Sequence, residues 1–282
     1  MSLGAPDAEL LERGPARRRL LTVSATDRLG LYSVLRVADP DGPPPAPGQF
    51  AMLAAAAGRR EDGSVRARAF SIARWCDGET QYLIEGVGGA SGRLCQLQAG
   101  EMLWVLGPLG RGFTPPGRGR RAILVGGGVG IAPLVILQDT LESAAHATTK
   151  SNAGTVVLLG FRDGTRALAA TLLPGSRAVT DDGSSGRRGR VTDLLARELD
   201  RDDEAVVYAC GPPGMLEAVR AMCAVRGVPG QLALAAQVAC GFGACDSCWI
   251  PRRDGGHLRV CVDGPVVNAD EVGCLARAKG SP

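Results

Sequence analysis

The chain has 282 residues, of which 45% are hydrophobic and 22% charged. This composition excludes wholesale disorder and a fibrous repeat, and the length suits two domains or one domain with an appendage. The net charge of +3 is too small to indicate nucleic acid or a membrane surface as a partner. No secretory segment or membrane span is visible, so we expect a cytoplasmic protein whose thiols stay reduced.

Residues 16–116 carry short β-rich runs separated by glycine and proline turns. The runs lie at 18–25, 31–38, 51–53, 70–73, 81–87 and 102–106. This rhythm predicts a small antiparallel barrel. The proline-rich stretch 39–47 is expected to be a stiff loop within it, and the glycines and prolines of 115–119 indicate a domain boundary.

Residues 117–230 have an α/β texture. Strands are predicted at 121–125, 155–159, 176–180 and 205–209, and helices at 131–141, 192–199 and 215–226. Such alternation is typical of a parallel sheet covered by helices. The first strand runs directly into Gly126, Gly127, Gly128 and Gly130. A strand, glycine turn and helix in this order present free amides to a pyrophosphate, although a tight turn without a ligand remains the alternative because Ile131 breaks the full G-x-G-x-x-G pattern.

The strongest chemical signal lies in residues 231–282. Cys240, Cys245, Cys248 and Cys261 have the spacing C-x4-C-x2-C-x12-C, which is the plant-type order of ligands around a [2Fe–2S] cluster. Glycines at 241 and 243 permit the tight loop that several inward-facing sulfurs require. Zinc is the alternative, but zinc modules usually bring two similar cysteine pairs.

The five other cysteines are given different interpretations. Cys76, Cys95 and Cys223 are expected to be small buried hydrophobic residues. Cys274 follows the cluster segment but falls outside the ligand spacing. Cys210 ends a predicted strand, at the sheet edge where ligands of such folds bind.

Several motifs follow one another in the order of a known family. They are Pro47-Gly-Gln-Phe50, Arg68-Ala-Phe-Ser-Ile72, Leu106-Gly-Pro-Leu-Gly110, Val125-Gly-Gly-Gly-Val-Gly-Ile-Ala-Pro133, Thr180-Asp-Asp-Gly183, Tyr208-Ala-Cys-Gly-Pro212 and Cys261-Val-Asp-Gly-Pro265. With the barrel, nucleotide sheet and cysteine loop, the chain resembles the ferredoxin reductase superfamily. More narrowly, it resembles the electron-transfer subunits of type B dihydroorotate dehydrogenases.

The resemblance implies FAD in the barrel. Residues Arg68, Ala69, Phe70, Ser71 and Ile72 would bind it, with Arg68 at the pyrophosphate and the Ser71 hydroxyl near flavin N5, where hydride arrives. A second phosphate-holding turn would comprise Gly88, Gly89, Ala90, Ser91 and Gly92.

It also implies that Gly126, Gly127, Gly128 and Gly130 hold a nicotinamide dinucleotide, and that Cys210 and Gly211 flank the nicotinamide. Cys210 and Ser71 are the candidate catalytic residues, although a plain core role for Cys210 stays open. Arg162 and Asp163 end the second sheet strand, where a carboxylate suits the ribose of NAD and an arginine the 2′-phosphate of NADP. The family favours NAD, and NADP is left open.

The function implied is an electron bridge in pyrimidine biosynthesis. A partner flavoprotein, such as an FMN-containing dihydroorotate dehydrogenase catalytic subunit, would deliver electrons singly to the cluster. FAD would collect two and pass a hydride to NAD+. The expected assembly is a hetero-oligomer without nucleic acid or membrane. The alternative is an NAD(P)H-dependent FAD and [2Fe–2S] reductase that serves another flavoenzyme or a monooxygenase.

Overall fold

A computed structural model describes residues 17–57, 67–117, 119–147, 154–201 and 204–275. Six strands form a closed antiparallel barrel in the order β1-β2-β5-β4-β3-β6. They are β1 (Arg18–Leu29), β2 (Tyr32–Ala38), β3 (Phe50–Ala55), β4 (Arg68–Cys76), β5 (Glu79–Glu85) and β6 (Met102–Leu109). Each coincides with one of the predicted runs, so the barrel expectation is confirmed. The short helix α2 (Gly89–Leu94) joins β5 to β6.

The second body is a seven-stranded sheet in the order β10-β9-β8-β7-β11-β12-β15. Its strands are β7 (Arg121–Gly127), β8 (Val156–Phe161), β9 (Arg177–Thr180), β10 (Arg187–Arg188), β11 (Ala205–Cys210), β12 (Gly230–Ala233) and β15 (Val266–Asn268). The first six run parallel: four of them, β7, β8, β9 and β11, were predicted, whereas β10 and β12 were not. β15 is antiparallel to β12. The strand order reverses between β7 and β11, which is where ligands of such sheets bind.

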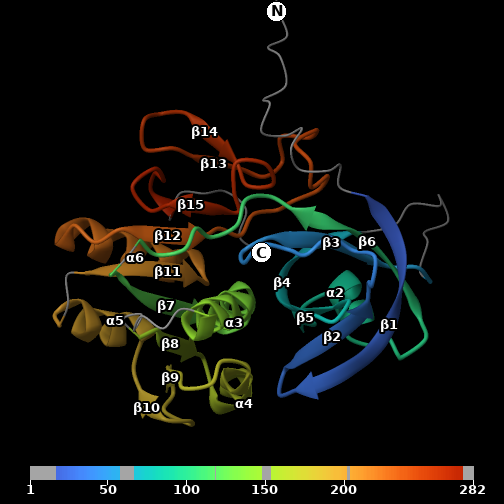
Figure 1. Ribbon diagram of the computed structural model, residues 1–282, viewed down its shortest axis with the longest axis horizontal. Coiled ribbons are helices and arrows are strands. Elements are labelled where there is room, and N and C mark those ends of the chain that lie inside the picture. Colours follow the sequence, from blue (N-terminus) through green and yellow to red (C-terminus); the bar gives the residue numbers. More distant parts are fainter. Residues whose placement is uncertain (1–16, 58–66, 118, 148–153, 202–203, 276–282) are drawn as a thin grey trace, which may run out of the picture.

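Helices cover this sheet. They are α3 (Ala132–Ala147), α4 (Gly164–Ala167), α5 (Val191–Leu199) and α6 (Pro213–Arg226), with short 3-10 turns η1 (Gly128–Ile131) and η2 (Leu168–Leu172). Figure 1 shows α3 between the sheet and the barrel. Arg74 of β4 and Asp139 of α3 form an ion pair across that boundary, with 2.7 Å between Nε and Oδ2. None of the described helices is long and apolar enough to cross a bilayer.

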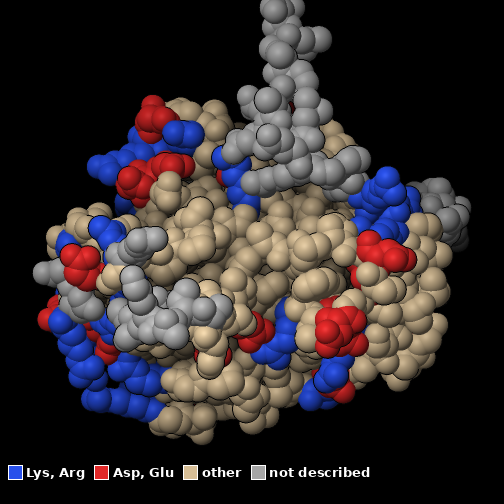
Figure 2. All heavy atoms as spheres, in the orientation of Figure 1, with Lys and Arg blue, Asp and Glu red and all other residues tan. Residues whose placement is uncertain are grey.

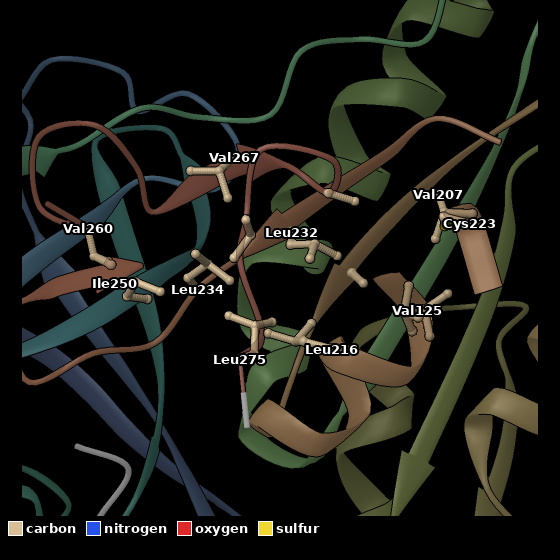
Figure 3. Close-up of a cluster of buried hydrophobic side chains, with 14 of the residues drawn as sticks. Val125, Val207, Leu216, Cys223, Leu232, Leu234, Ile250, Val260, Val267 and Leu275 are labelled. Carbon is tan, nitrogen blue, oxygen red and sulfur yellow. The ribbon is translucent and has the colours of Figure 1, made fainter. Parts of the chain in front are cut away.

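The C-terminal segment shares a core with the sheet. It adds the hairpin β13 (Trp249–Pro251) and β14 (His257–Arg259) before β15. Figure 3 shows Ile250, Val260 and Val267 of this segment meeting Leu232 and Leu234 at the end of β12. Burial of so many apolar side chains in one cluster is the main attraction that holds the segment to the sheet.

Charges of both signs are scattered over the face drawn in Figure 2, including a red and blue group near its centre. Lys and Arg side chains gather on this face near β10 and α5. The expectation that Cys76 is buried is wrong: the thiol is exposed, while Cys95 is half-buried and Cys223 buried. Cys76 ends β4, where the turn through Asp77 and Gly78 connects it to the neighbouring barrel strand β5.

Candidate functional site

The cysteine loop, which runs from Cys240 to Cys248, has the tight backbone that its glycines predicted. Gly241 and Gly243 have φ angles of +88° and +85°, a region that side chains with a Cβ rarely adopt. A Cβ on Gly241 would stand 2.9 Å from Met52 Cγ and 3.0 Å from Leu109 Cδ1. The loop therefore presses against barrel strands β3 and β6, and residue 241 has to be small.

The cysteine sulfurs in this loop receive polar contacts. The Ala244 N–H donates to Cys240 Sγ at 3.3 Å, and Ser247 Oγ lies 3.2 Å from Cys245 Sγ. Burial alone would raise the pKa of Cys240, but amide donors from Phe242, Ala244 and Cys245 lower it to about 7. Such donors stabilise a thiolate, which is the form that binds metal.

The thiols lie in two pairs. The Cys245 thiol influences the pKa of Cys240, and the Cys248 thiol influences that of Cys261. Burial, with the neighbouring Cys248, raises the pKa of the Cys261 thiol to about 12. Among the described residues, no three or more His, Cys, Asp or Glu side chains surround a single point where one metal ion would sit. Two pairs suit two irons with two thiolates each, so the donor set fits a [2Fe–2S] cluster better than a single zinc ion.

Cys274 lies elsewhere. Its thiol is exposed beside Arg220 of α6, and the next residue, Leu275, donates its N–H to Glu217 Oε2 at 3.1 Å. These contacts tie residue 274 to helix α6. The structure thus gives no support to Cys274 as a ligand.

The loop has one face toward the barrel and one toward solvent. On the barrel side, the Arg111 N–H donates to the Gly264 carbonyl. Toward the sheet, the Leu234 N–H, directly after β12, donates to the Pro265 carbonyl at 2.8 Å. On the solvent side, Cys245 is exposed, and so are Phe242 (62%) and Trp249 (51%). Trp249 packs edge-on against His257, with 4.1 Å between ring centroids. Exposed aromatic residues beside a buried core are typical of protein interfaces.

Strand β4 carries the residues expected at the flavin. Arg68 is exposed, Ala69, Phe70 and Ser71 are half-buried, and Ile72 is buried. Ser71 is paired with Phe50 of β3, and Ala69 with Met52. The Ile72 N–H donates to the Gln49 carbonyl at 3.0 Å, which extends the ladder into the Pro47–Phe50 motif. Met52 therefore lies between the cysteine loop and the strand of the expected flavin site.

The turn before α2 is open. The Gly88 N–H donates to Ser91 Oγ at 3.2 Å, and a Cβ on Gly88, Gly89 or Gly92 would meet no atom within 4 Å. Space of this kind next to free backbone amides suits a phosphate group. Ala90, between them, lies in the first turn of the helix.

The glycine turn after β7 meets the end of β11. Cys210 is aligned with Gly126 across the two strands. A Cβ on Gly130 would stand 2.7 Å from Gly211 Cα, and one on Gly127 would stand 2.7 Å from Met215 Sδ. The two loops are packed backbone to backbone at the switch point, as the expected nicotinamide site requires. Burial raises the pKa of the Cys210 thiol to about 12, so it is neutral at physiological pH.

The carboxylate that follows β8, expected to bind a ribose, already has protein partners. Asp163 caps α4 by accepting the Arg166 N–H at 3.0 Å, and its Oδ2 lies 2.6 Å from Arg166 Nη1. The same guanidinium donates to Glu85 Oε1 of barrel strand β5 at 3.0 Å. Asp163 is thus part of a link between the two bodies, whereas Arg162 is exposed. Sequence reasoning missed this link because Glu85 lies 81 positions from Arg166.

The chain matches two known domain families. Residues 236–273 match the iron-sulfur cluster binding domain of dihydroorotate dehydrogenase B. Residues 124–221 match the oxidoreductase NAD-binding domain. The matches cover the cysteine loop and the glycine turn, the two features with the most specific sequence patterns.

Solved structures share the fold. An NADH-dependent reduced ferredoxin-NADP oxidoreductase aligns with a TM-score of 0.75 at 22% identity, covering 93% of this chain and 94% of that one. A ferredoxin NADP+ reductase from Neisseria gonorrhoeae, solved with FAD and NADP, aligns with a TM-score of 0.60 at 17% identity over 75% of this chain and 92% of its own.

Relatives with a higher identity are more specific. The probable dihydroorotate dehydrogenase B (NAD(+)) electron transfer subunit of Methanopyrus kandleri is 37% identical over 227 residues, which are 80% of each chain. The corresponding subunit of Bacillus caldolyticus is 41% identical over 201 residues, 68% of this chain and 72% of its own. With the barrel, the nucleotide sheet and the cysteine loop in the same order, this chain belongs to the family of dihydroorotate dehydrogenase B electron transfer subunits.

Proposed function

We propose that this chain carries electrons from the catalytic subunit of a dihydroorotate dehydrogenase to NAD+, within a hetero-oligomer. The observation that carries the proposal is the position of the cysteine loop. Gly241 touches Met52, one strand away from β4, while Cys245, Phe242 and Trp249 face outward. A loop between a flavin strand and an open surface suits one-electron passage between two proteins. The relatives' names support the choice of partner and of NAD+.

The cofactors would supply the redox chemistry: the cluster moves single electrons, and FAD and NAD exchange a hydride. The protein's part is to position them. Cys240, Cys245, Cys248 and Cys261 would hold the cluster, and the amide at Ala244 would keep the Cys240 sulfur anionic. The glycines at 241 and 243 let these donors converge in one short loop.

The flavin would lie along β4. Arg68 would bind its pyrophosphate together with the open Gly88–Gly92 turn, and Ser71 would donate a hydrogen bond near N5. The turn from Gly126 to Gly130 would hold the dinucleotide, with Cys210 and Gly211 beside the nicotinamide. As a neutral, buried thiol, Cys210 would shape the ring pocket rather than exchange protons.

Three functional units follow from this assignment. Residues 16–116 would form the FAD unit, 117–230 the NAD unit and 231–282 the cluster unit. We place the protein in the cytoplasm, since nine free cysteines suit a reducing compartment.

The experiment is anaerobic reconstitution of the chain, loaded with FAD and cluster, with a dihydroorotate dehydrogenase catalytic subunit. We expect NADH to form when dihydroorotate and NAD+ are added. Cys245→Ser should abolish this coupled reaction and leave reduction of FAD by NADH intact. Cys274→Ser is the matched control, because it removes an exposed thiol outside the ligand set.

Two results would contradict the proposal. One is coupled NADH formation by Cys245→Ser at the wild-type rate, which would bypass the cluster. The other is anaerobic co-purification of the wild-type chain with a different flavoenzyme and no coupling to dihydroorotate. That result would favour a reductase with the same cofactors and another partner.

A further inference from the structure

Tyr32, the first residue of β2, carries a hydroxyl without an explanation in the fold. The side chain is fully buried. Its hydroxyl has no hydrogen-bond partner among the residues that the structure describes. A buried polar group of this kind costs free energy unless something satisfies it, and native proteins keep few of them.

The hydroxyl lies next to the glycine turn of the nucleotide sheet. A Cβ built on Gly128 would have Tyr32 Oη as its only neighbour within 4 Å, at 3.7 Å. Gly128 itself is partly exposed, and its φ of +55° excludes most side chains. With no side chain on Gly128, the Tyr32 hydroxyl is the nearest atom on that side of the turn.

The charged groups around Tyr32 are already engaged. Glu85 is its direct neighbour across the β2–β5 ladder, and both Glu85 and Asp163 pair with Arg166. Burial, followed by the charge of Glu85, raises the pKa of the Tyr32 hydroxyl, while Arg166 opposes this. The group is thus a neutral hydrogen-bond donor at any physiological pH.

The other buried polar atoms without partners are in different settings. Arg36 also pairs with Asp27, and Gln138 donates through Nε2 to Glu142 and Pro174. These two side chains have partners for their remaining atoms. The third, Thr26 of β1, also has no partner for its one polar atom, but only the Tyr32 hydroxyl is within 4 Å of the Cβ position of Gly128. It is this atom that lies against the turn expected to hold a dinucleotide.

We propose that Tyr32 Oη donates a hydrogen bond to the pyrophosphate of the dinucleotide that rests on the Gly126–Gly130 turn. The inference rests on the nucleotide site of the proposed function. It adds a barrel residue to a site otherwise built from the sheet. Nucleotide binding would then satisfy a donor that the free protein leaves unpaired, so Tyr32 acts as a binding residue at the boundary of the two bodies.

The test is Tyr32→Phe in the FAD-loaded subunit, which removes one oxygen atom. The affinity for nucleotide should fall, whereas the stability of the nucleotide-free subunit should not. The Kd values for NADH and for ADP-ribose should both rise roughly tenfold or more, the usual effect of losing a hydrogen bond to a charged group. The melting temperature without nucleotide should hold or rise, because an unsatisfied buried hydroxyl is gone.

Tyr82→Phe is the matched control. Tyr82 is equally buried but lies in the separate core cluster inside the barrel, so its loss of a hydroxyl should leave both Kd values unchanged. Wild-type affinity in Tyr32→Phe would overturn the inference, and so would weaker binding of NADH with unchanged binding of ADP-ribose. Failure of the wild-type subunit to bind NADH at all would instead count against the proposed function, which separates the two ideas.

Discussion

Gly241 of the cysteine loop lies against Met52 of strand β3, and Met52 is aligned with Ala69 of strand β4. Two of the three expected cofactor sites are therefore separated by a single side chain. The contact exists because residue 241 has no Cβ, which would stand 2.9 Å from Met52 Cγ. A short path between the expected cluster and flavin sites would depend on this close approach.

The substitution Gly241→Ala tests the role of this close contact between the cysteine loop and Met52. A methyl group there must push the loop away from Met52 and Leu109, so we expect reduced cluster content and slower electron exchange between cluster and FAD. Iron analysis and rapid-mixing spectroscopy measure the two effects. Gly255→Ala is the control, since Gly255 also has a positive φ of 91° but nothing within 4 Å of its Cβ position. Equal losses in both variants would assign the effect to backbone strain.

The two exposed aromatic residues of this segment, Phe242 and Trp249, give a second prediction. Phe242→Ala and Trp249→Ala should each weaken binding of the catalytic subunit, by about 2 kcal/mol if they are interface hot spots. That change corresponds to roughly a 30-fold increase in Kd. Val225→Ala, on α6, removes an even more exposed apolar side chain (84%) and should leave the Kd unchanged. If all three variants bind like the wild type, the partner docks elsewhere.

Cys210 gives a prediction about the nicotinamide site. Cys210→Ala should slow FAD reduction by NADH by about tenfold through poorer placement of the ring, with flavin content unchanged. Because burial raises the thiol's pKa to about 12, the wild-type rate should show no ionisation of this group between about pH 6 and pH 10. Stopped-flow measurements across pH check both points. Cys223→Ala, another buried thiol, should keep the wild-type rate.

Glu198 gives a prediction about stability. Its carboxylate, 2% exposed on α5, pairs with Arg121 of β7 at 2.9 Å and with Arg177 of β9 at 2.8 Å. Burial raises its pKa, but the two arginines outweigh burial and lower it. Glu198→Gln should reduce the free energy of unfolding by about 3 kcal/mol at neutral pH, because the arginines lose a buried partner.

The pH dependence of this effect follows from the sign of the shift. The folded pKa of Glu198 is below the unfolded one, so the ion pairs stabilise the protein fully above the unfolded pKa of about 4.3. The stabilisation is lost as the pH falls through the folded value. Urea unfolding of wild type and variant at pH 7 and below pH 4 should show the difference shrinking. Asp27→Asn, which breaks the exposed pair with Arg36, should hardly change stability at either pH.

Local patterns were sufficient for most of the fold. The six barrel runs and the strand before Gly126 depend on residues close in sequence, and each appears where it was predicted. Contacts between distant residues were not visible: Asp163 looked available for a ribose, yet Arg166 and Glu85 engage it. Cys76 looked like a core residue because composition alone does not locate the end of a strand.

The placement of β15 has a consequence for the solubility of the protein. This strand follows the cluster cysteines in sequence and closes the β12 edge of the nucleotide sheet. Whenever the cysteine segment is detached, β12 presents an unpaired edge, which invites pairing with other chains. Because apolar packing holds this segment to the sheet, a substitution that weakens the packing would expose β12 and lower the solubility of the protein.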